Sequence, residues 1–137
     1  MTKEFWFNLP VKNVQKATAF FTQIGFTLNS HYNNNESSAS FFIGQKNIVM
    51  MLFDYPSFKG FTGNETADAT KVSEVLFSID AESKEEVDEI VKRAIAAGGA
   101  SSHKPSEMQG WMYGCVFTDL DGHRWNVLHM DMSKMPR

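Results

Sequence analysis

The side chains that could carry chemistry in this sequence are few and scattered. It contains four histidines: His31, His103, His123 and His129. No two of them have the spacing of paired metal ligands on one element. His129 follows Asn126 by three residues, so in a strand the two side chains point to opposite faces. We therefore predict that the histidines are surface or rim residues rather than a metal site.

Glu74 and Cys115 are two further groups with chemical potential. Glu74 opens the apolar run 74–80, which is typical of a strand, and we expect its side chain to point inward. Because burying a lone carboxylate is costly, two interpretations stay open. Glu74 pairs with Arg124 or a linker lysine, or it is a general base whose burial favours the protonated form. Cys115 lies in an apolar strand with no nearby cation, which predicts a buried, unreactive thiol.

The elements that must position these groups begin with residues 4–11, an apolar and aromatic run predicted to be a strand buried on both faces. Asn13 is the expected N-cap of a helix, because apolar residues follow at helical spacing up to Ile24 and Gly25 provides a stop. The next strands are predicted at 26–32, 38–43 and 48–53, with an asparagine-rich loop at 33–35 and a turn at 44–47.

Residues 54–71 break this regularity. Pro56 and Gly63 interrupt any period, so we predict a linker or lid loop. Phe58 and Phe61 stand out within it, since aromatic side chains on a loop are expected to pack against another surface. Packing on the rim of the chain's own barrel is the simpler expectation.

The first pattern then returns. A strand at 74–80 is followed by a capping box, Ser83 with Glu86, and by a helix that ends at Gly98-Gly99. Strands are predicted at 100–103, 110–118 and 124–130, with Asp119–Gly122 as a tight turn. A strand-helix-strand-strand-strand unit therefore occurs twice, offset by about seventy residues. Each unit alone is too small to bury its sheet, which favours two units sharing one body.

Two segments resemble a known family. Leu9–Val14, followed by a helix that carries Phe20-Phe21 and ends at Ile24–Phe26, resembles the opening of the vicinal oxygen chelate superfamily, which includes glyoxalase I, bleomycin-resistance and extradiol-dioxygenase proteins. Phe117–Val127 resembles the aspartate-x-aspartate-glycine turn and final strand of that superfamily. The likeness covers residues 4–130. It implies an α+β fold of two βαβββ modules forming an open, cup-like mixed barrel with helices outside, in a homodimer.

The expected division of the chain follows from this resemblance. We predict an N-terminal module at 1–54, a linker or lid loop at 55–72, a C-terminal module at 73–131 and a tail at 132–137, all within one glyoxalase-like domain.

The resemblance also implies where a metal would bind. Metal-dependent members hold a divalent cation on four inward side chains, usually two histidines and two glutamates. These positions fall on Trp6, Met50 or Met51, Glu74 and Asn126. Because indole, thioether and amide groups are poor ligands for hard cations, we predict no metal and no cofactor. The alternatives are a metal-dependent glyoxalase-like lyase, isomerase or dioxygenase with atypical ligands, or acid–base chemistry by Glu74 alone.

A cleft of this composition predicts binding of a small amphiphilic or aromatic molecule. Strand alternation places some of its candidate residues on one face, leaves the side of Trp111 and Tyr113 open, and allows core packing for Met50. Glu74 is the candidate catalytic residue, and the predicted ligand-binding residues are Trp6, Asn8, Met50, Leu76, Trp111, Tyr113 and Asn126.

Composition narrows the remaining classes. The 137 residues are 42% hydrophobic and 21% charged, as in ordinary globular proteins. The net charge of −3, without a basic run, argues against a nucleic-acid partner. No apolar run approaches the roughly 18 residues of a membrane span, and no signal peptide is evident. We therefore expect a cytoplasmic protein that has a small-molecule ligand and no membrane partner.

Overall fold

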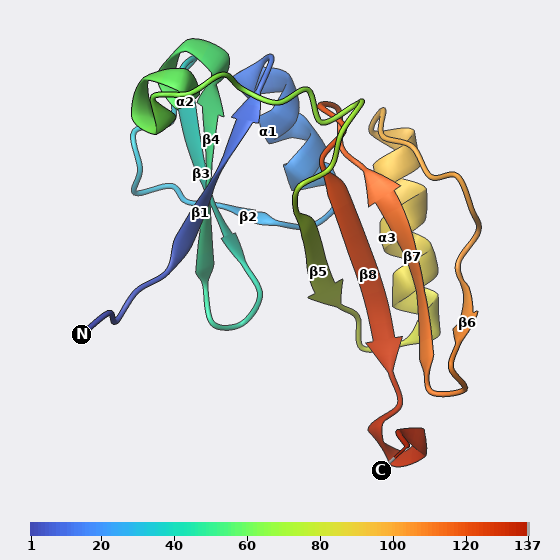
Figure 1. The fold of residues 1–137 in the computed structure, drawn as a ribbon. Helices are drawn as coiled ribbons and strands as arrows, with labels where there is room; N and C mark the ends of the chain where they lie inside the picture. The colour runs from blue at the N-terminus through green and yellow to red at the C-terminus, as the bar shows by residue number, and fades with distance from the viewer. Residues whose placement is uncertain (137) are drawn as a thin grey trace. The chain divides into compact units, whose positions relative to one another are not determined.

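The computed structural model describes residues 1–136, which divide into two compact units. Unit 1 runs from Met1 to Asp68, and unit 2 begins at Ala69. Each unit contains a four-stranded mixed sheet with a helix packed on it (Figure 1). Within the described chain, no helix has the length and apolar character needed to cross a bilayer.

Unit 1 is built on the strand order β1-β4-β3-β2, in which β1 is parallel to β4 and the other pairs are antiparallel. Its elements are β1 (Trp6–Val11), α1 (Val14–Gln23), β2 (Thr27–Leu28), β3 (Ser38–Ile43), β4 (Ile48–Asp54) and α2 (Tyr55–Thr62).

Unit 2 repeats that topology in the order β5-β8-β7-β6, with β5 parallel to β8. Its elements are β5 (Leu76–Asp80), α3 (Lys84–Ala96), β6 (Ser106–Met108), β7 (Met112–Thr118), β8 (Arg124–Met130) and the short 3₁₀ helix η1 (Met132–Lys134). The predicted α+β class and the two βαβββ modules are confirmed. The predicted tail contains η1, and residue 137 lies outside the described residues.

The helix caps predicted from the sequence are present in both units. The Asn13 side chain accepts a hydrogen bond from the N–H of the third helical residue at 2.9 Å, and Ser83 does the same at 3.0 Å. Gly25 and Gly98 follow the helices with φ of 106° and 103°, a region that glycine enters without strain. The capping box is altered in one respect, because the Glu86 carboxylate accepts from the N–H of Glu82 at 3.3 Å.

The two cores lie between sheet and helix and are packed differently. In unit 1, the ring of Phe21 on α1 lies 5.7 Å from Phe26 and 6.0 Å from Phe41. In unit 2 the helix contributes aliphatic side chains, such as the fully buried Val87, against the aromatic rings of the sheet, including Trp125. Burial of these apolar surfaces is the main term that stabilises each unit.

The prediction of a structureless loop at 55–72 is wrong for its first part, where α2 forms. Asp54 caps this helix by accepting from a first-turn N–H at 2.9 Å. Pro56 lies in the first turn, where a helix needs no donor, and Gly63 ends the helix with φ of 67°. Proline is favoured at that position, so Pro56 supports the start of the helix and does not break it.

Phe58 and Phe61 lie on α2, which packs against β1 and β4. The ring of Phe61 is 4.9 Å from that of Phe53, although Phe61 remains 72% exposed. Phe61 therefore contacts one ring of the chain's own sheet while most of its side chain stays exposed.

Two predicted strands are short or displaced. The strand expected at 26–32 is reduced to β2, because asparagine side chains satisfy the backbone that follows: Asn34 Oδ1 accepts from the N–H of Ser40 at 2.9 Å, and Asn34 Nδ2 donates to the carbonyl of Asn29 at 3.0 Å. The strand expected at 100–103 is a single bridge between Ala100 and Thr118. The edge of that sheet is formed by β6 instead.

The edge strands β1 and β5 also differ from prediction. Phe5 and Trp6 are 68% and 55% exposed, so burial on both faces is wrong for the start of β1. Strand β5 begins at Leu76, which leaves Glu74 outside it. An apolar run predicts that a strand forms. Whether that strand is covered on both sides depends on its position at the edge or in the centre of the sheet.

Candidate functional site

The face of the unit 1 sheet opposite α1 is identified by strand register. Phe41 contacts α1, and its register partner Met50 lies on the same side. Asn8, Met51 and Ser40 form the neighbouring register row and therefore lie on the opposite side. We call this side the open face of unit 1. It consists of Trp6, Asn8, Pro10, Ser38, Ser40, Phe42, Val49, Met51 and Phe53.

The open face of unit 2 follows from the same reasoning. The Tyr113 hydroxyl donates to Asp88 Oδ1 of α3 at 2.7 Å, so Tyr113 marks the helix side. The opposite side, which we call the open face of unit 2, consists of Leu76, Ser78, Asp80, Gly114, Val116, Thr118, Arg124, Asn126 and Leu128. It carries more polar side chains than the open face of unit 1, which carries the aromatic side chains of Trp6, Phe42 and Phe53.

Four of the predicted ligand-binding residues lie on open faces. Trp6 and Asn8 are exposed on that of unit 1, and Leu76 and Asn126 lie on that of unit 2. Asn126 Nδ2 donates to Ser78 Oγ, its register partner, at 3.4 Å. Both open faces therefore combine apolar surface with an amide.

Two of the predicted residues lie on the helix side instead. Met50 is fully buried beneath α1, so its placement in a cleft is corrected; Met51 points to the open face instead, where it is itself buried at 8% exposure. Tyr113 bonds to α3, and this hydrogen bond with Asp88, together with burial, raises the pKa of Tyr113 to about 12. A one-residue difference in register decides which face a side chain occupies.

Trp111 lies in the turn between β6 and β7, outside the strand in which it was predicted. The turn contains Gln109 and Gly110, both with positive φ, at 55° and 78°. The Trp111 carbonyl accepts from the N–H of Asp131 at 2.8 Å. Its indole Nε1 is buried without a hydrogen-bond partner among residues 1–136.

Glu74 is exposed and precedes β5 by two residues, so the inward strand position predicted for it is wrong. A comparison of the two repeats shows where the strand begins. The N-caps Asn13 and Ser83 are 70 positions apart. The first residues of the two edge strands, Trp6 and Leu76, are also 70 positions apart, so Leu76 corresponds to Trp6. No ion pair joins Glu74 to Arg124 within the described chain. A role for Glu74 in acid–base chemistry stays a prediction.

The aspartate-x-aspartate-glycine turn is a structural anchor. Asp119 is 5% exposed, and its carboxylate accepts from the N–H groups of Asp121 and His123, each at 3.0 Å, and from the indole of Trp125 at 3.1 Å. Burial raises the pKa of Asp119, against the opposing effects of His123 and of the Trp125 hydrogen bond. A carboxylate with three donors holds the turn and the start of β8 together.

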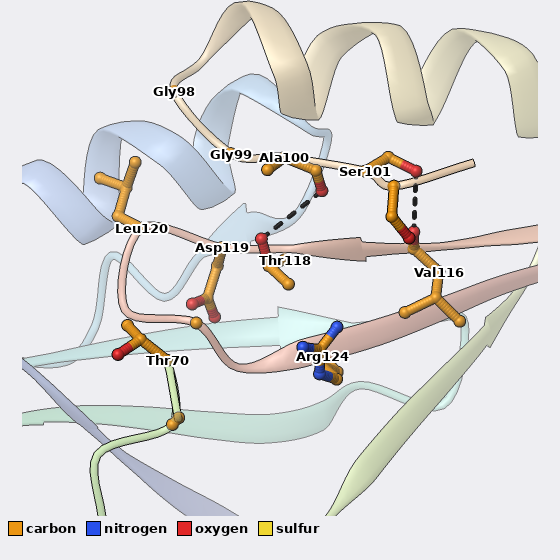
Figure 2. Close-up of a pocket in the computed structure, with 13 residues that line it drawn as sticks. Thr70, Gly98, Gly99, Ala100, Ser101, Val116, Thr118, Asp119, Leu120 and Arg124 are labelled. Carbon is orange, nitrogen blue, oxygen red and sulfur yellow. Dashed lines mark hydrogen bonds between the residues drawn. The ribbon is translucent and has the colours of Figure 1, made fainter. Parts of the chain in front are cut away.

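A pocket that the sequence analysis did not predict lies beside this turn (Figure 2). It has a volume of about 380 Å³ and is lined by Ala69, Thr70, Gly98–Ser102, Val116, Thr118–Leu120, Gly122 and Arg124. The Gly98-Gly99 pair and the turn were recognised from the sequence, but only as chain reversals. The contact between them depends on the pairing of Ala100 with Thr118.

Comparison with known proteins identifies the family. The model of the Glyoxalase/Bleomycin resistance protein/Dioxygenase superfamily matches residues 5–127. The chain belongs to this superfamily. A hypothetical protein from S. aureus is 33% identical, with 94% of each chain covered and a TM-score of 0.82. No match is found among curated proteins.

More distant superfamily structures share the fold. A glyoxalase/bleomycin resistance protein/dioxygenase family enzyme from Burkholderia phytofirmans is 19% identical over 93% of this chain and 99% of its own, with a TM-score of 0.77. A genomically encoded fosfomycin resistance protein from Listeria monocytogenes, complexed with Mn(II) and sulfate, is 19% identical over 98% of this chain and 94% of its own, with a TM-score of 0.70.

The side chains of this chain at the metal-binding positions of metal-dependent superfamily members do not fit a metal ion. Glu74, which the resemblance places at one of these positions, is exposed and lies outside β5; the open-face residues at or next to the four positions are Trp6, Met51, Leu76 and Asn126, an indole, a thioether, an alkyl chain and an amide. None of these open-face residues is an anionic or imidazole donor, the types that divalent cations require. Throughout residues 1–136, no three histidine, cysteine, aspartate or glutamate side chains are grouped so that they could hold a metal ion.

The cysteine and histidines have structural contacts. Cys115 is a buried free thiol, as predicted, and its Sγ lies 3.2 Å from the carbonyl of His103. His103 Nδ1 is 2.7 Å from Ser102 Oγ, and His129 Nδ1 is 3.1 Å from the carbonyl of Ala81. These contacts hold local backbone in place and leave the chemistry of the open faces to other residues.

Proposed function

We propose that this superfamily member binds a small amphiphilic or aromatic molecule on the open faces of its sheets, without the metal that many relatives use. The observation that carries the proposal is that Trp6, Leu76 and Asn126 lie on the open faces, at or next to positions where the resemblance places the superfamily's metal ligands. Side chains of these types recognise planar or apolar groups by stacking and dispersion, with an amide for hydrogen bonding.

The exposure of the two corresponding residues supports this proposal. Trp6 is 55% exposed and Leu76 is 54% exposed, which is unusual for large apolar side chains at equivalent places in both units. Covering the exposed half of an indole removes on the order of 100 Å² from water and stabilises a complex by about 2 kcal/mol. Polar groups beside them, Asn8 in unit 1 and the Asn126–Ser78 pair in unit 2, supply orientation.

A homodimer, which the family resemblance implies, is part of the same proposal. Association through either edge strand would cover some of the apolar surface that a ligand would use. Binding and oligomeric state therefore have to be measured on the same sample.

The test is a titration of chelator-treated, ¹⁵N-labelled protein with naphthol, followed by NMR shifts of β1 and β5 amides, with light scattering before and after. We expect saturable shifts at these strands. Trp6→Ala is expected to weaken binding roughly ten- to thirtyfold. Ile95→Ala, which removes a 52% exposed residue from α3, is the matched control and is expected to bind as the parent does.

Two results would contradict the proposal. One is naphthol binding that is absent, or equal in the parent and the Trp6→Ala variant. The other is stoichiometric Ni, Zn, Mn or Fe in the purified protein that is lost in Glu74→Ala, which would replace the proposal with the metal-dependent lyase, isomerase or dioxygenase.

A further inference from the structure

A second hollow adjoins the pocket beside the Asp119 turn. It has a volume of about 460 Å³ and is lined by Ser73, Glu74, Val75, Leu76, Ser102, His103, Val116 and Arg124. Three residues, Ser102, Val116 and Arg124, line both hollows. Together the two form what we call the Arg124 groove, which runs over the open face of unit 2.

We propose that the Arg124 groove binds the acidic head of a small organic anion. This inference rests on the proposed function, because it assigns a charged head to the amphiphilic molecule described above. Figure 2 shows Arg124 among the lining residues, with Thr118 and residues 98–101 on one side and Thr70 on the other.

The guanidinium of Arg124 is held in place yet has donors to spare. Its Nε donates to Ser73 Oγ at 3.1 Å, which restrains the plane of the group. Its two terminal amino groups have no hydrogen-bond or ion-pair partner within residues 1–136. A planar fork of free N–H donors matches the two oxygens of a carboxylate or phosphonate.

The other charges along the groove favour one orientation of the anion. In the first hollow the only other charged side chain is Asp119, which is buried and whose oxygens already accept three hydrogen bonds. In the second hollow Glu74 is exposed and repels an anion, while His103 lies beside it. The acidic head is therefore placed toward the first hollow, beside Thr118.

The remainder of the molecule has an apolar surface to lie on. Leu76 is the register partner of Arg124 and is 54% exposed, and Val116, which borders both hollows, is 37% exposed. An alkyl or aromatic tail that extends from the head along these side chains would cover them. The groove thus combines a cationic end with an apolar floor, the complement of an organic acid.

A comparison with unit 1 shows that the guanidinium of Arg124 has no counterpart at the corresponding place in that unit. The register partner of Trp6 is Val49, whereas that of the corresponding Leu76 is Arg124. The same place in the duplicated sheet therefore holds an aliphatic residue in one unit and a guanidinium in the other. The open face of unit 1 contains no lysine or arginine.

The experiment compares phenylacetate with phenylacetamide, which has the same shape without the charge. Both are titrated into ¹⁵N-labelled protein, and the amides of Ser101, Ser102 and Thr118 are followed by NMR. We expect phenylacetate to shift these amides and to bind about tenfold or more tightly than phenylacetamide. Phenylphosphonate, titrated in parallel, distinguishes a phosphonate head from a carboxylate, and tighter binding of either acid supports the groove.

Variants at one position separate charge from structure. Arg124→Gln is expected to reduce phenylacetate binding to the level of phenylacetamide and to leave phenylacetamide unchanged, and Arg124→Lys to retain part of the preference. Arg93→Gln is the control, because Arg93 is also an exposed arginine, lies on α3 outside the groove and is paired with Glu89. Arg124 is exposed, so both of its variants are expected to fold, which the dispersion of the amide spectrum verifies.

The outcomes also separate this inference from the proposed function. Equal binding of phenylacetate and phenylacetamide, or a charge preference that survives Arg124→Gln, overturns the acid site while leaving naphthol binding and its Trp6 dependence intact. Loss of naphthol binding with a retained, Arg124-dependent preference for phenylacetate overturns the proposed aromatic ligand and keeps the acid site. Failure of all the probes to bind overturns both.

Discussion

The sheets of unit 1 and unit 2 have the same strand order and similarly placed helices, but their turns and open faces differ in chemistry. The β3–β4 turn at 44–47 of unit 1 is exposed, with Gly44 and Asn47 at positive φ. The corresponding β7–β8 turn of unit 2 buries Asp119 and presses Gly122 against the backbone of residues 69 and 70.

This difference shows which parts of a duplicated unit are constrained by the fold and which are free to vary. Caps and helix-facing core residues recur in both copies, since each copy needs them to form its layers. The β7–β8 turn of unit 2 has an additional constraint, because it holds the first residues of that unit in contact with the end of β7. The open faces are free of both constraints, and there Trp6 corresponds to Leu76, and Val49 corresponds to Arg124.

The largest expected difference between the units is at these turn glycines. Gly122 has φ of 87°, and a Cβ there would lie 2.7 Å from the backbone nitrogen of Thr70. Gly122→Ala is therefore expected to destabilise unit 2 by about 3 kcal/mol or more. Gly44 has φ of 73° with open space around it, so Gly44→Ala should cost only ~1 kcal/mol, from backbone strain.

Urea unfolding of each variant, followed by NMR at amides of both units, measures these costs separately. Equal losses for the two glycine variants would show that the contact of the Gly122 turn with residues 69 and 70 contributes nothing to stability.

The helix caps are expected to give the same effect in both units. Asn13→Ala and Ser83→Ala each remove a side-chain acceptor from a first-turn N–H, and each should destabilise its own unit by about 1 kcal/mol. Hydrogen exchange of the first-turn amides of α1 and α3 reports the change locally. Asn13→Ser is the conservative control and should keep most of the stability. A cost at only one of the two caps would break the equivalence of the repeats.

The smallest effect is expected at Tyr113, a polar tie between sheet and helix in unit 2. The hydrogen bond to Asp88 raises the pKa of Tyr113 from 10.0 to about 12. Since the folded state holds this proton more tightly than the unfolded chain, the stabilisation is complete below pH 10 and is lost as the pH rises through 12. Tyr113→Phe should therefore flatten the decline in unfolding free energy across that range.

Lys84 also contributes to the pH dependence in this range, so the Tyr113→Phe variant has to be compared with the parent protein. The pKa of Lys84 is raised by its hydrogen bond to Glu107, so it also loses its proton at alkaline pH. Denaturation at a series of pH values must therefore be read as the difference between the two proteins. Identical slopes for Tyr113→Phe and the parent would mean that the bond to Asp88 does not form in solution.

Much of this fold could be predicted from the sequence, because the decisive signals are local. Asn13 and Ser83 indicate helix starts, Gly25 and Gly98 indicate helix ends, and Asp119–Gly122 indicates a turn, each through interactions within a few residues. Helix α2 also has local signals, because Asp54 caps it and Pro56 lies in its first turn, but the same proline is equally typical of a loop.

The candidate site was predicted less well, because faces depend on register. Alternation places Met50 and Met51 on opposite sides of β4, but which of the two faces α1 followed only from the pairing of Phe41 with Met50. Tyr113 required the position of Asp88 on a helix 25 residues away in sequence. Glu74 was placed inward because its strand was expected to begin two residues early.

The sequence by itself determined the duplicated topology, the caps and the turn at Asp119–Gly122, since these are matters of residue type and short spacing. Only the tertiary structure decided which side chains share a face, that Leu76 corresponds to Trp6, and that Arg124 keeps free donors in a groove beside Val116. Pairing between distant strands decides these points, and a shift of one residue in that pairing moves every side chain of a strand to the other face.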